Sequence, residues 1–410
     1  MGVQQYGWGK QSPCEVSRLW EGNCGGGEAE GPFAELWAGT HPELESKLAD
    51  GSATPLSERL PSVVSSAFEK AFPSCRDGHL PFLAKVLSVR RPLSLQAHPD
   101  KELAERLHSS KPHLFKDSNH KPEMALAITP FRLLSGLVPV HHLRSSLHSC
   151  PELRQMIGND TASSVESCNS DFESPSAVTE AFQAFAARVA HDRSKAQEMS
   201  EKLQQRLSAS KSLSCEDELA LELLSHFPGD GGAFAAYLLQ HLSLQPGQAV
   251  YQPVNEPHTY ISGDCVEVQA TSDNVARAGL TSKTCDADAL ASMLARRSDS
   301  SCVLFGERES DFVVSYKPND REIATMKVVV PPGNSAELPQ LFGPAIVLAR
   351  SGWGEASDAA KSSNTKQKVS TGSMFLVRDG AHVVLQANSS SSDPLEAYVA
   401  CAQSSGADEA

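Results

Sequence analysis

The stretch from Pro92 to Met124 contains residues whose types and spacing could perform chemistry. Leu93 to His98 alternates apolar and polar residues with the period of a half-buried strand, so Gln96 and His98 share one face. Glu123 follows 25 residues after His98, beside a second apolar run. An amide oxygen, an imidazole and a carboxylate together make a plausible site for a divalent metal ion, with zinc as the first candidate.

Such a site needs a further ligand, and His258 offers one much later in the chain. Gln-x-His is a short and common pattern. On spacing alone, Gln96 and His98 are better explained as surface residues beside a turn at Pro99 and Asp100. The metal site therefore needs support from longer motifs.

The elements that must position these residues form a β structure interrupted by helices. Strand patterns occupy residues 1–149 and return at 243–320, whereas 150–242 carries helix-period segments joined by polar links. We predict one β domain in two parts, with an all-helical insertion whose charged residues are solvated and have no functional role. Short strands with turn-rich links over 321–402 predict a C-terminal β domain, a sandwich or barrel, before a disordered tail at 403–410.

The composition argues against several classes of function. The 410 residues carry a net charge of −14, whereas binding to nucleic acid or to acidic membranes would need a basic face. The ten cysteines form no CxxC pair and the first ten residues lack the apolar core of a secretory signal, so we expect reduced thiols and a cytoplasmic protein. No stretch approaches the roughly 18 apolar residues of a membrane span.

Five longer sequence motifs are together more specific than the spacing of single residues. QAHPDK and NHKPEM are the most specific of them in combination, and the chain resembles the type I phosphomannose isomerases, a zinc-dependent cupin-type family. The resemblance spans most of the chain. The five blocks are Tyr6 to Lys10, Glu35 to Pro42, Leu93 to Lys101, Asn119 to Met124 and Asn255 to Lys283.

The resemblance implies a mainly β protein with an all-α insertion, in which a cupin-like jelly-roll catalytic domain is joined to a second cupin-like β domain. It implies reversible conversion of mannose 6-phosphate to fructose 6-phosphate through an enediol, supplying mannose 6-phosphate for GDP-mannose synthesis. We expect a monomer that binds this phosphosugar. One Zn²⁺ per chain is implied, held by Gln96, His98, Glu123 and His258.

Other residues of the matching blocks are candidates for catalysis. The family's SDNxxRAGLT pattern occurs here as SDNVARAGLT, and the resemblance marks its arginine, Arg277, as an active-site residue. Its fixed positive charge could stabilise the enediolate or orient the substrate. The group that moves the proton stays open among Lys121, Glu267, Asp273 and a metal-bound water.

Substrate-binding candidates are less specific. Tyr260 shares a strand face with His258 and could contact the sugar, although packing against a neighbouring strand fits equally well. The phosphate needs donors in spite of the acidic net charge, and Ser94, Lys101 and Lys283 are candidates.

Two other interpretations compete with an isomerase. A metal-binding cupin without isomerase activity would need the ligands but not Arg277, Lys121 or the carboxylates at 267 and 273. An iron oxygenase of this fold would use two histidines and one carboxylate, and Gln96 argues against that arrangement.

Overall fold

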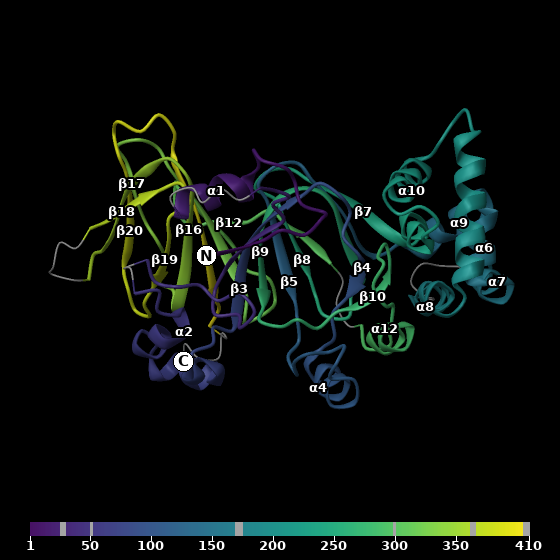
Figure 1. The fold of residues 1–410 in the computed structure, drawn as a ribbon, viewed down its shortest axis with the longest axis horizontal. Coiled ribbons are helices and arrows are strands. Elements are labelled where there is room, and N and C mark those ends of the chain that lie inside the picture. Colours follow the sequence, from purple (N-terminus) through teal and green to yellow (C-terminus); the bar gives the residue numbers. More distant parts are fainter. Residues whose placement is uncertain (25–29, 50–51, 169–174, 298–300, 361–365, 405–410) are drawn as a thin grey trace.

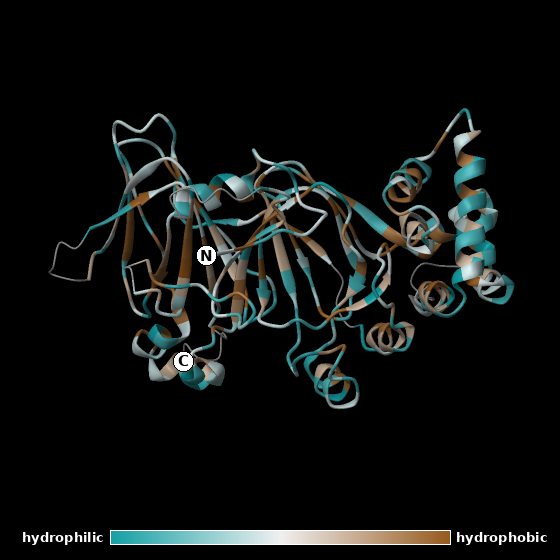
Figure 2. Ribbon diagram, in the orientation of Figure 1, coloured by the Kyte–Doolittle hydropathy of each residue, from teal (hydrophilic) through white to brown (hydrophobic). Residues whose placement is uncertain are grey.

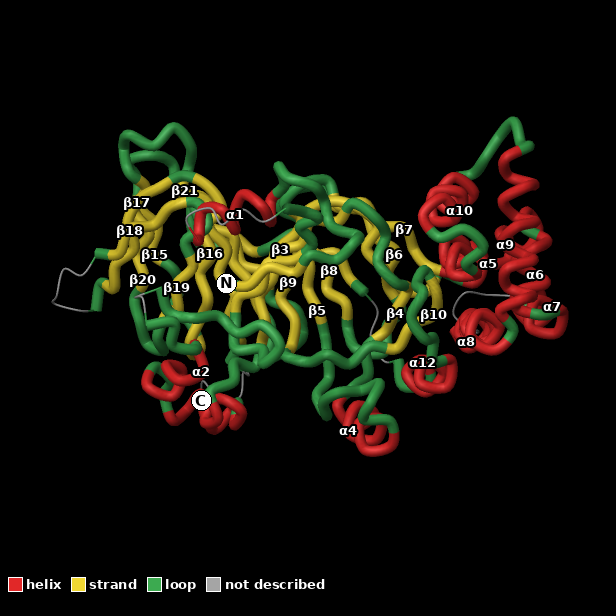
Figure 3. Tube along the Cα trace, in the orientation of Figure 1, coloured by secondary structure: helices red, strands yellow, loops and turns green. Residues whose placement is uncertain are grey.

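The structure is a computed structural model, and it describes residues 1–24, 30–49, 52–168, 175–297, 301–360 and 366–404. Strands fill the middle and one end of an elongated molecule, and helices gather at the other end (Figure 3). The predicted disordered tail lies mostly outside the described residues. No helix in the described ranges combines the length and apolar character that crossing a membrane would require.

The central sheet has eleven strands and is antiparallel in its pairings (Figure 1). Its main order is β1-β2-β3-β9-β5-β8-β11, and β4, β6, β7 and β10 attach beside this path. The strands are β1 (Gly2–Gln4), β2 (Glu35–Ala38), β3 (Phe82–Val89), β4 (Leu95–Ala97), β5 (Glu123–Ala127), β6 (Phe131–Leu137), β7 (Leu239–Leu244), β8 (Ala249–Gln252), β9 (His258–Ala270), β10 (Ala276–Gly279) and β11 (Cys302–Leu304).

Strand β9 is the scaffold of this sheet. It is 13 residues long and pairs with β3, β4, β5 and β6. All eight residues of β3 beside it are buried, because apolar clusters cover both faces of the sheet there. Because both faces of β3 are covered, its sequence is a nearly continuous apolar run and does not alternate between apolar and polar residues. The exceptions in that run are Lys85 and Ser88, and Lys85 is the one charged residue among them.

Helices follow β6 and form most of one end of the molecule (Figure 1). They share one apolar cluster with β4 and β10, which fastens them to the central sheet. The helices are α5 (Val140–Ser149), α6 (Pro151–Ile157), α7 (Asn159–Ser167), α8 (Pro175–His191), α9 (Arg193–Ser208), α10 (Cys215–His226), η3 (Gly231–Phe234) and α11 (Ala235–Leu238), with α4 (Lys101–Ser110) and α12 (Ala287–Leu294) nearby.

The ends of this helical portion differ from the sequence prediction. Helices begin at Val140, inside the part assigned to the β domain, and the residues up to 242 are not all helical. Helix α11 stops at Leu238, and β7 follows at once as a partner of β6. Pairing with β6 decides the conformation of 239–244, and a tertiary contact of this kind overrides local helix preference.

The C-terminal β domain is a two-sheet sandwich. Its apolar core lies between a six-stranded and a four-stranded sheet, and apolar segments run along these strands (Figure 2). The first sheet holds β12 (Glu307–Arg308), β13 (Val313–Tyr316), β14 (Ala324–Val330), β16 (Phe342–Ser351), β19 (Met374–Val377) and β21 (Leu395–Ala402), and the second holds β15 (Ser335–Glu337), β17 (Trp353–Asp358), β18 (Gln367–Ser370) and β20 (Val383–Ala387).

The predicted fold class, mainly β with a helical portion, is confirmed, and neither β domain closes into a barrel within the described residues. A shared apolar cluster joins β2, β3 and β9 of the central sheet to β16 and β21 of the sandwich. Short N-terminal helices contribute residues to this cluster, namely α1 (Glu15–Cys24), η1 (Leu60–Ser62), α3 (Ser66–Ala71) and η2 (Pro73–Asp77), and α2 (Leu56–Arg59) directly precedes η1.

One ion pair links the QAHPDK–NHKPEM region to the sandwich. His120, in the loop before β5, places Nε2 3.0 Å from Oε1 of Glu322, which lies between β13 and β14. Burial lowers the pKa of His120, but Glu322 and the nearby Asp320 together outweigh burial and raise that pKa above its usual value.

We therefore predict that this pair stabilises the fold at lower pH. A raised folded-state pKa gives stability that is fully present below the unfolded pKa of about 6.5 and is lost as pH rises through the folded value. Replacing His120→Gln should lower the melting temperature of the chelator-treated protein more at about pH 6 than at about pH 8.5. The exposed His113→Gln is the control, and an equal loss at both pH values would contradict the prediction.

Candidate active site and metal centre

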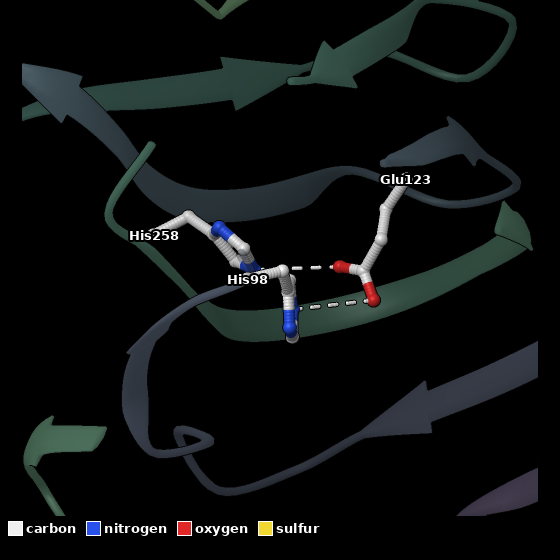
Figure 4. Close-up of side chains that lie close together, drawn as sticks. All are labelled: His98, Glu123 and His258. Atoms are coloured by element: carbon white, nitrogen blue, oxygen red, sulfur yellow. Dashed lines mark ion pairs between the residues drawn. The ribbon is translucent and has the colours of Figure 1, made fainter. Parts of the chain in front are cut away.

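Two histidines and one glutamate meet where three neighbouring strands end or begin (Figure 4). His98 directly follows β4, Glu123 opens β5, and His258 opens β9. The Nε2 atoms of His98 and His258 lie 3.4 and 3.3 Å from the two carboxylate oxygens of Glu123. All three side chains are buried, and neither Nε2 atom has a hydrogen-bond partner in the described part of the chain. Two such nitrogens aimed at one carboxylate fit a bound divalent cation.

The other ring nitrogens explain this orientation. Nδ1 of His98 lies 2.7 Å from the backbone oxygen of Asn274, and Nδ1 of His258 lies 3.0 Å from that of Glu256. A carbonyl can only accept, so each Nδ1 carries the proton and each Nε2 keeps its lone pair for a metal. Burial, followed by Lys121, lowers the pKa of His98 to about 4, so its imidazole is neutral near pH 7.

Glu123 is held in its charged form. Burial alone would raise the pKa of its carboxyl, but Lys121 and the two histidines together outweigh burial and hold that pKa well below its usual range. Nζ of Lys121 lies 3.0 Å from Oε1 of Glu123. A neutral imidazole and an ionised carboxylate are the protonation states that metal binding requires.

Asn255 ties two of these ligand segments together. Its backbone N–H donates to the carbonyl of His98 at 2.6 Å, and its side chain exchanges two hydrogen bonds with Asp100. Its φ of 65° is left-handed, a conformation that asparagine tolerates better than most residues.

The metal cluster lies beside a cavity of about 490 Å³, which Glu123 lines. Nine of the residues proposed from the sequence line this cavity, so segments far apart in the chain converge on one site. They are Ser94, Gln96, Lys121, Glu123, Tyr260, Glu267, Asp273, Arg277 and Lys283.

Gln96, the fourth proposed metal ligand, sits opposite His258 in the β4–β9 pairing and opposite Arg277 in the β4–β10 pairing. Its Oε1 accepts a hydrogen bond from Ser94 Oγ at 3.1 Å. Its place on the cavity wall is compatible with metal ligation, which stays a prediction.

Lys101 is not brought to the cavity. It is the first residue of α4, exposed, and absent from the cavity wall. Asp100 caps that helix by accepting from the N–H of Leu103, and α4 projects away from the sheet (Figure 1). The phosphate role considered for Lys101 is therefore withdrawn.

Arg277 keeps its charge available to a ligand. It lines the cavity from β10, and its guanidinium has no ion pair or hydrogen bond to any residue that the structure describes. Asp273, the partner that a surface ion pair would have used, instead lies 3.4 Å from His41 Nε2 and 3.8 Å from Lys116 Nζ. Burial lowers the pKa of Arg277, as expected for a cation without a neighbouring carboxylate.

Sequence reasoning missed Lys85. Its buried Nζ lies 3.2 Å from Glu267, 3.7 Å from Glu35 and 2.8 Å from Gln269 Oε1. Burial would lower its pKa, but Glu35 and Glu267 raise it above the usual value, so Lys85 is charged. The available signal was a single charged residue inside a buried strand that is apolar except for Ser88.

Strand β9 changes its inward face part-way along. His258 and Tyr260 are directed at the site, yet Glu267 and Gln269 also line the cavity, although simple alternation would put them on the other face. The β6–β9 register shifts here, because consecutive residues of β6 pair with Ser262 and Tyr260. An extra residue of this kind re-aims the side chains that follow it.

The helical portion also reaches the site. Phe227 lines the cavity and stacks under Arg91, whose guanidinium carbon lies 4.4 Å from the ring centroid. Asp230 accepts from the backbone N–H of Thr281 at 3.1 Å and so holds the loop that carries Lys283. The expectation that this portion has only solvated charges was therefore wrong at its C-terminal end.

The comparisons with known proteins agree with this geometry. A family model described as phosphomannose isomerase type I, catalytic domain, matches residues 1–140. The chain is 36% identical over 399 residues to mannose-6-phosphate isomerase 1 of Arabidopsis thaliana, covering 94% of this chain and 90% of that protein. The chain belongs to the type I phosphomannose isomerase family. It is also 40% identical over 343 residues to mannose-6-phosphate isomerase of Homo sapiens, covering 80% of this chain and 81% of that protein.

The family's fold extends over the whole chain. A crystal structure of mannose 6-phosphate isomerase from Salmonella typhimurium, bound to its substrate and to zinc, matches with a TM-score of 0.70. The match covers 98% of each chain at 22% identity. The family resemblance drawn from the motifs is thus confirmed, and so is the fold that it implied.

We predict that removing one histidine of the cluster abolishes tight metal binding. His98→Ala should lower Zn²⁺ affinity by more than the about 10–100-fold that losing an outer partner of a ligand costs. Competition with a chromophoric chelator measures this. The control is His108→Ala, which removes a half-buried histidine whose Nδ1 also meets a backbone carbonyl, that of Phe115. Unchanged zinc affinity in His98→Ala would exclude His98 as a ligand.

Proposed function

We propose that this chain interconverts mannose 6-phosphate and fructose 6-phosphate, with one Zn²⁺ held by Gln96, His98, Glu123 and His258. The observation that carries the proposal is the buried His–Glu–His cluster, whose two Nε2 atoms have no hydrogen-bond partner among the described residues. It lies beside a cavity that also presents the guanidinium of Arg277. Family membership supports the same reaction, since the curated relatives are named for it.

The reaction moves a carbonyl between carbons 1 and 2 of the sugar. A proton leaves the carbon beside the carbonyl, an enediol forms, and the proton returns to the neighbouring carbon. When bound, zinc would polarise the carbonyl oxygen and favour the negative charge that develops during proton removal. Arg277, with no carboxylate partner in the described ranges, supplies a second fixed positive charge in the same cavity.

Glu267 is the residue that we favour as the base. It lines the cavity and is buried, and burial followed by Glu123 raises the pKa of its carboxyl in spite of Lys85. A carboxylate with a raised pKa is better matched to proton transfer near neutral pH. Lys121 and Asp273 also line the cavity, but Lys121 is engaged with Glu123, and Asp273 has its pKa lowered.

Lys283 and Ser94 are the proposed contacts of the phosphate. Burial, then Arg277 and Lys116, lowers the pKa of Lys283, so two neighbouring cations make this rim positive in a protein of net charge −14. A dianionic phosphate is attracted to such a local potential. Tyr260 lines the same cavity and is proposed to contact the sugar, with its hydroxyl held 3.0 Å from Gln252 Oε1.

We further propose a cytoplasmic monomer that supplies mannose 6-phosphate for GDP-mannose synthesis. Cys75, Cys150, Cys265 and Cys401 are buried free thiols, and this supports a reducing compartment.

The decisive experiment measures interconversion of the two phosphosugars by the purified protein. We expect activity that a chelator removes and added Zn²⁺ restores. A zinc-loaded, folded protein without isomerisation would contradict the proposal and favour a metal-binding cupin without this activity. Oxygen uptake with an iron-loaded sample would instead indicate an oxygenase.

Two substitutions should separate the roles of the cavity cations. Arg277→Ala should lower kcat by about 10²–10³-fold, the effect of losing a group that stabilises developing charge. Lys283→Met should raise KM by about 10-fold or more with little change in kcat, as expected for one charge-assisted hydrogen bond to the substrate. Steady-state kinetics in both directions measure both effects. Lys101→Met is the control, and a matching rise in its KM would contradict the assignment of Lys283.

A further inference from the structure

Asp117 joins the loop before β5 to a segment 155 residues later in the chain. Its Oδ1 accepts hydrogen bonds from Ser272 Oγ at 2.8 Å and from Asn274 Nδ2 at 3.1 Å, and its Oδ2 accepts from the backbone N–H of Asp273 at 2.8 Å. The backbone oxygen of Asp117 accepts a further bond from Asn274 Nδ2 at 2.7 Å. One residue thus fixes three consecutive residues of the SDN block.

That block is in direct contact with the metal cluster. The backbone oxygen of Asn274 lies 2.7 Å from Nδ1 of His98, and this contact sets the tautomer that leaves Nε2 free. Ser272 and Asn274 are buried, and β10, which carries Arg277, begins two residues later. The position of the Asn274 carbonyl therefore affects His98 on one side and the start of β10 on the other.

We propose that Asp117 is a positioning residue of the metal centre, acting through the Asn274 carbonyl on His98. It does not touch a metal or the substrate. Asp117 accepts from a hydroxyl, an amide and a backbone N–H at once, and an uncharged side chain of the same length has only one oxygen for them. Without the carboxylate, the backbone N–H of Asp273 loses its acceptor. The 272–274 turn then keeps only the bonds of Ser272 and Asn274 to the backbone oxygens of Asp117 and Asn119, so the Asn274 carbonyl that orients the imidazole is held less firmly.

This inference rests on the proposed function only in that both need the metal. Metal affinity and the absorption spectrum of the Co²⁺-substituted protein test it without turnover. If the protein binds zinc but does not isomerise the phosphosugars, the proposed function is contradicted. The role of Asp117 is then still tested by the metal affinity and the Co²⁺ spectrum.

Asp117→Ala should weaken Zn²⁺ binding by about 10–100-fold, the cost of losing an outer partner of a ligand. It should also change the visible absorption of the Co²⁺ form, because the orientation of the His98 ring changes. Asp117→Asn keeps Oδ1 but faces the N–H of Asp273 with an amide, so its zinc affinity should lie between that of Asp117→Ala and that of the unsubstituted protein.

Asp192→Ala is the matched control. Asp192 also accepts from a backbone N–H, that of Lys195, and pairs with Arg188, but it caps α9 in the helical portion. Its loss should leave zinc affinity and the Co²⁺ spectrum unchanged. A folded Asp117→Ala protein with unchanged zinc affinity and spectrum overturns the inference. If Asp117→Ala does not fold, the same comparison made on Asp117→Asn decides it.

Discussion

The site depends on how buried charge is balanced. In the described part of the chain, three buried carboxylates, Glu35, Glu123 and Glu267, are matched at this site by two lysines, Lys85 and Lys121. Charges removed from water are costly unless they are paired. Three carboxylates against two lysines leave this group with one negative charge in excess. A divalent cation among Glu123 and the two histidines would turn that excess into one positive charge. A site of that sign suits an anionic substrate, and Arg277 adds to it.

The sheet makes this balance possible because it fixes carboxylates and lysines from different strands within a few ångströms. Strand β9 pairs with β3, which carries Lys85, and with β5, which carries Glu123. The same strand carries His258, Tyr260 and Glu267, and its register shift near Ile261 turns all three toward one site. Without this register shift, simple alternation would place the Glu267 side chain on the face of the sheet that points away from the cavity.

Loops at the cavity rim are held by three polar residues, of which Asp117 and Asp230 lie outside the five motif blocks. Asp117 anchors the SDN block, Asn255 joins the His98 and His258 segments, and Asp230 holds the loop before Lys283. These contacts use backbone N–H groups and short polar side chains. They make the helical portion and the central sheet parts of one active site.

The motifs alone were enough to assign the family and the fold class, and through the family resemblance they nominated His98, Glu123 and His258, which the structure brings together. Gln-x-His by itself is too short to predict a metal site, and the longer blocks QAHPDK and NHKPEM supplied the specificity. Ligand chemistry restricts the residue types in those blocks, and strand alternation places their side chains on one face. The packing of distant segments places Lys101 outside the cavity, whereas it brings Lys85 and Phe227 to the cavity wall. Tertiary pairing also makes residues 239–244 a strand, and it changes which side chains of β9 face the cavity after the register shift. These features depend on pairing between distant segments and on the direction of a chain after a turn, which local residue patterns do not encode.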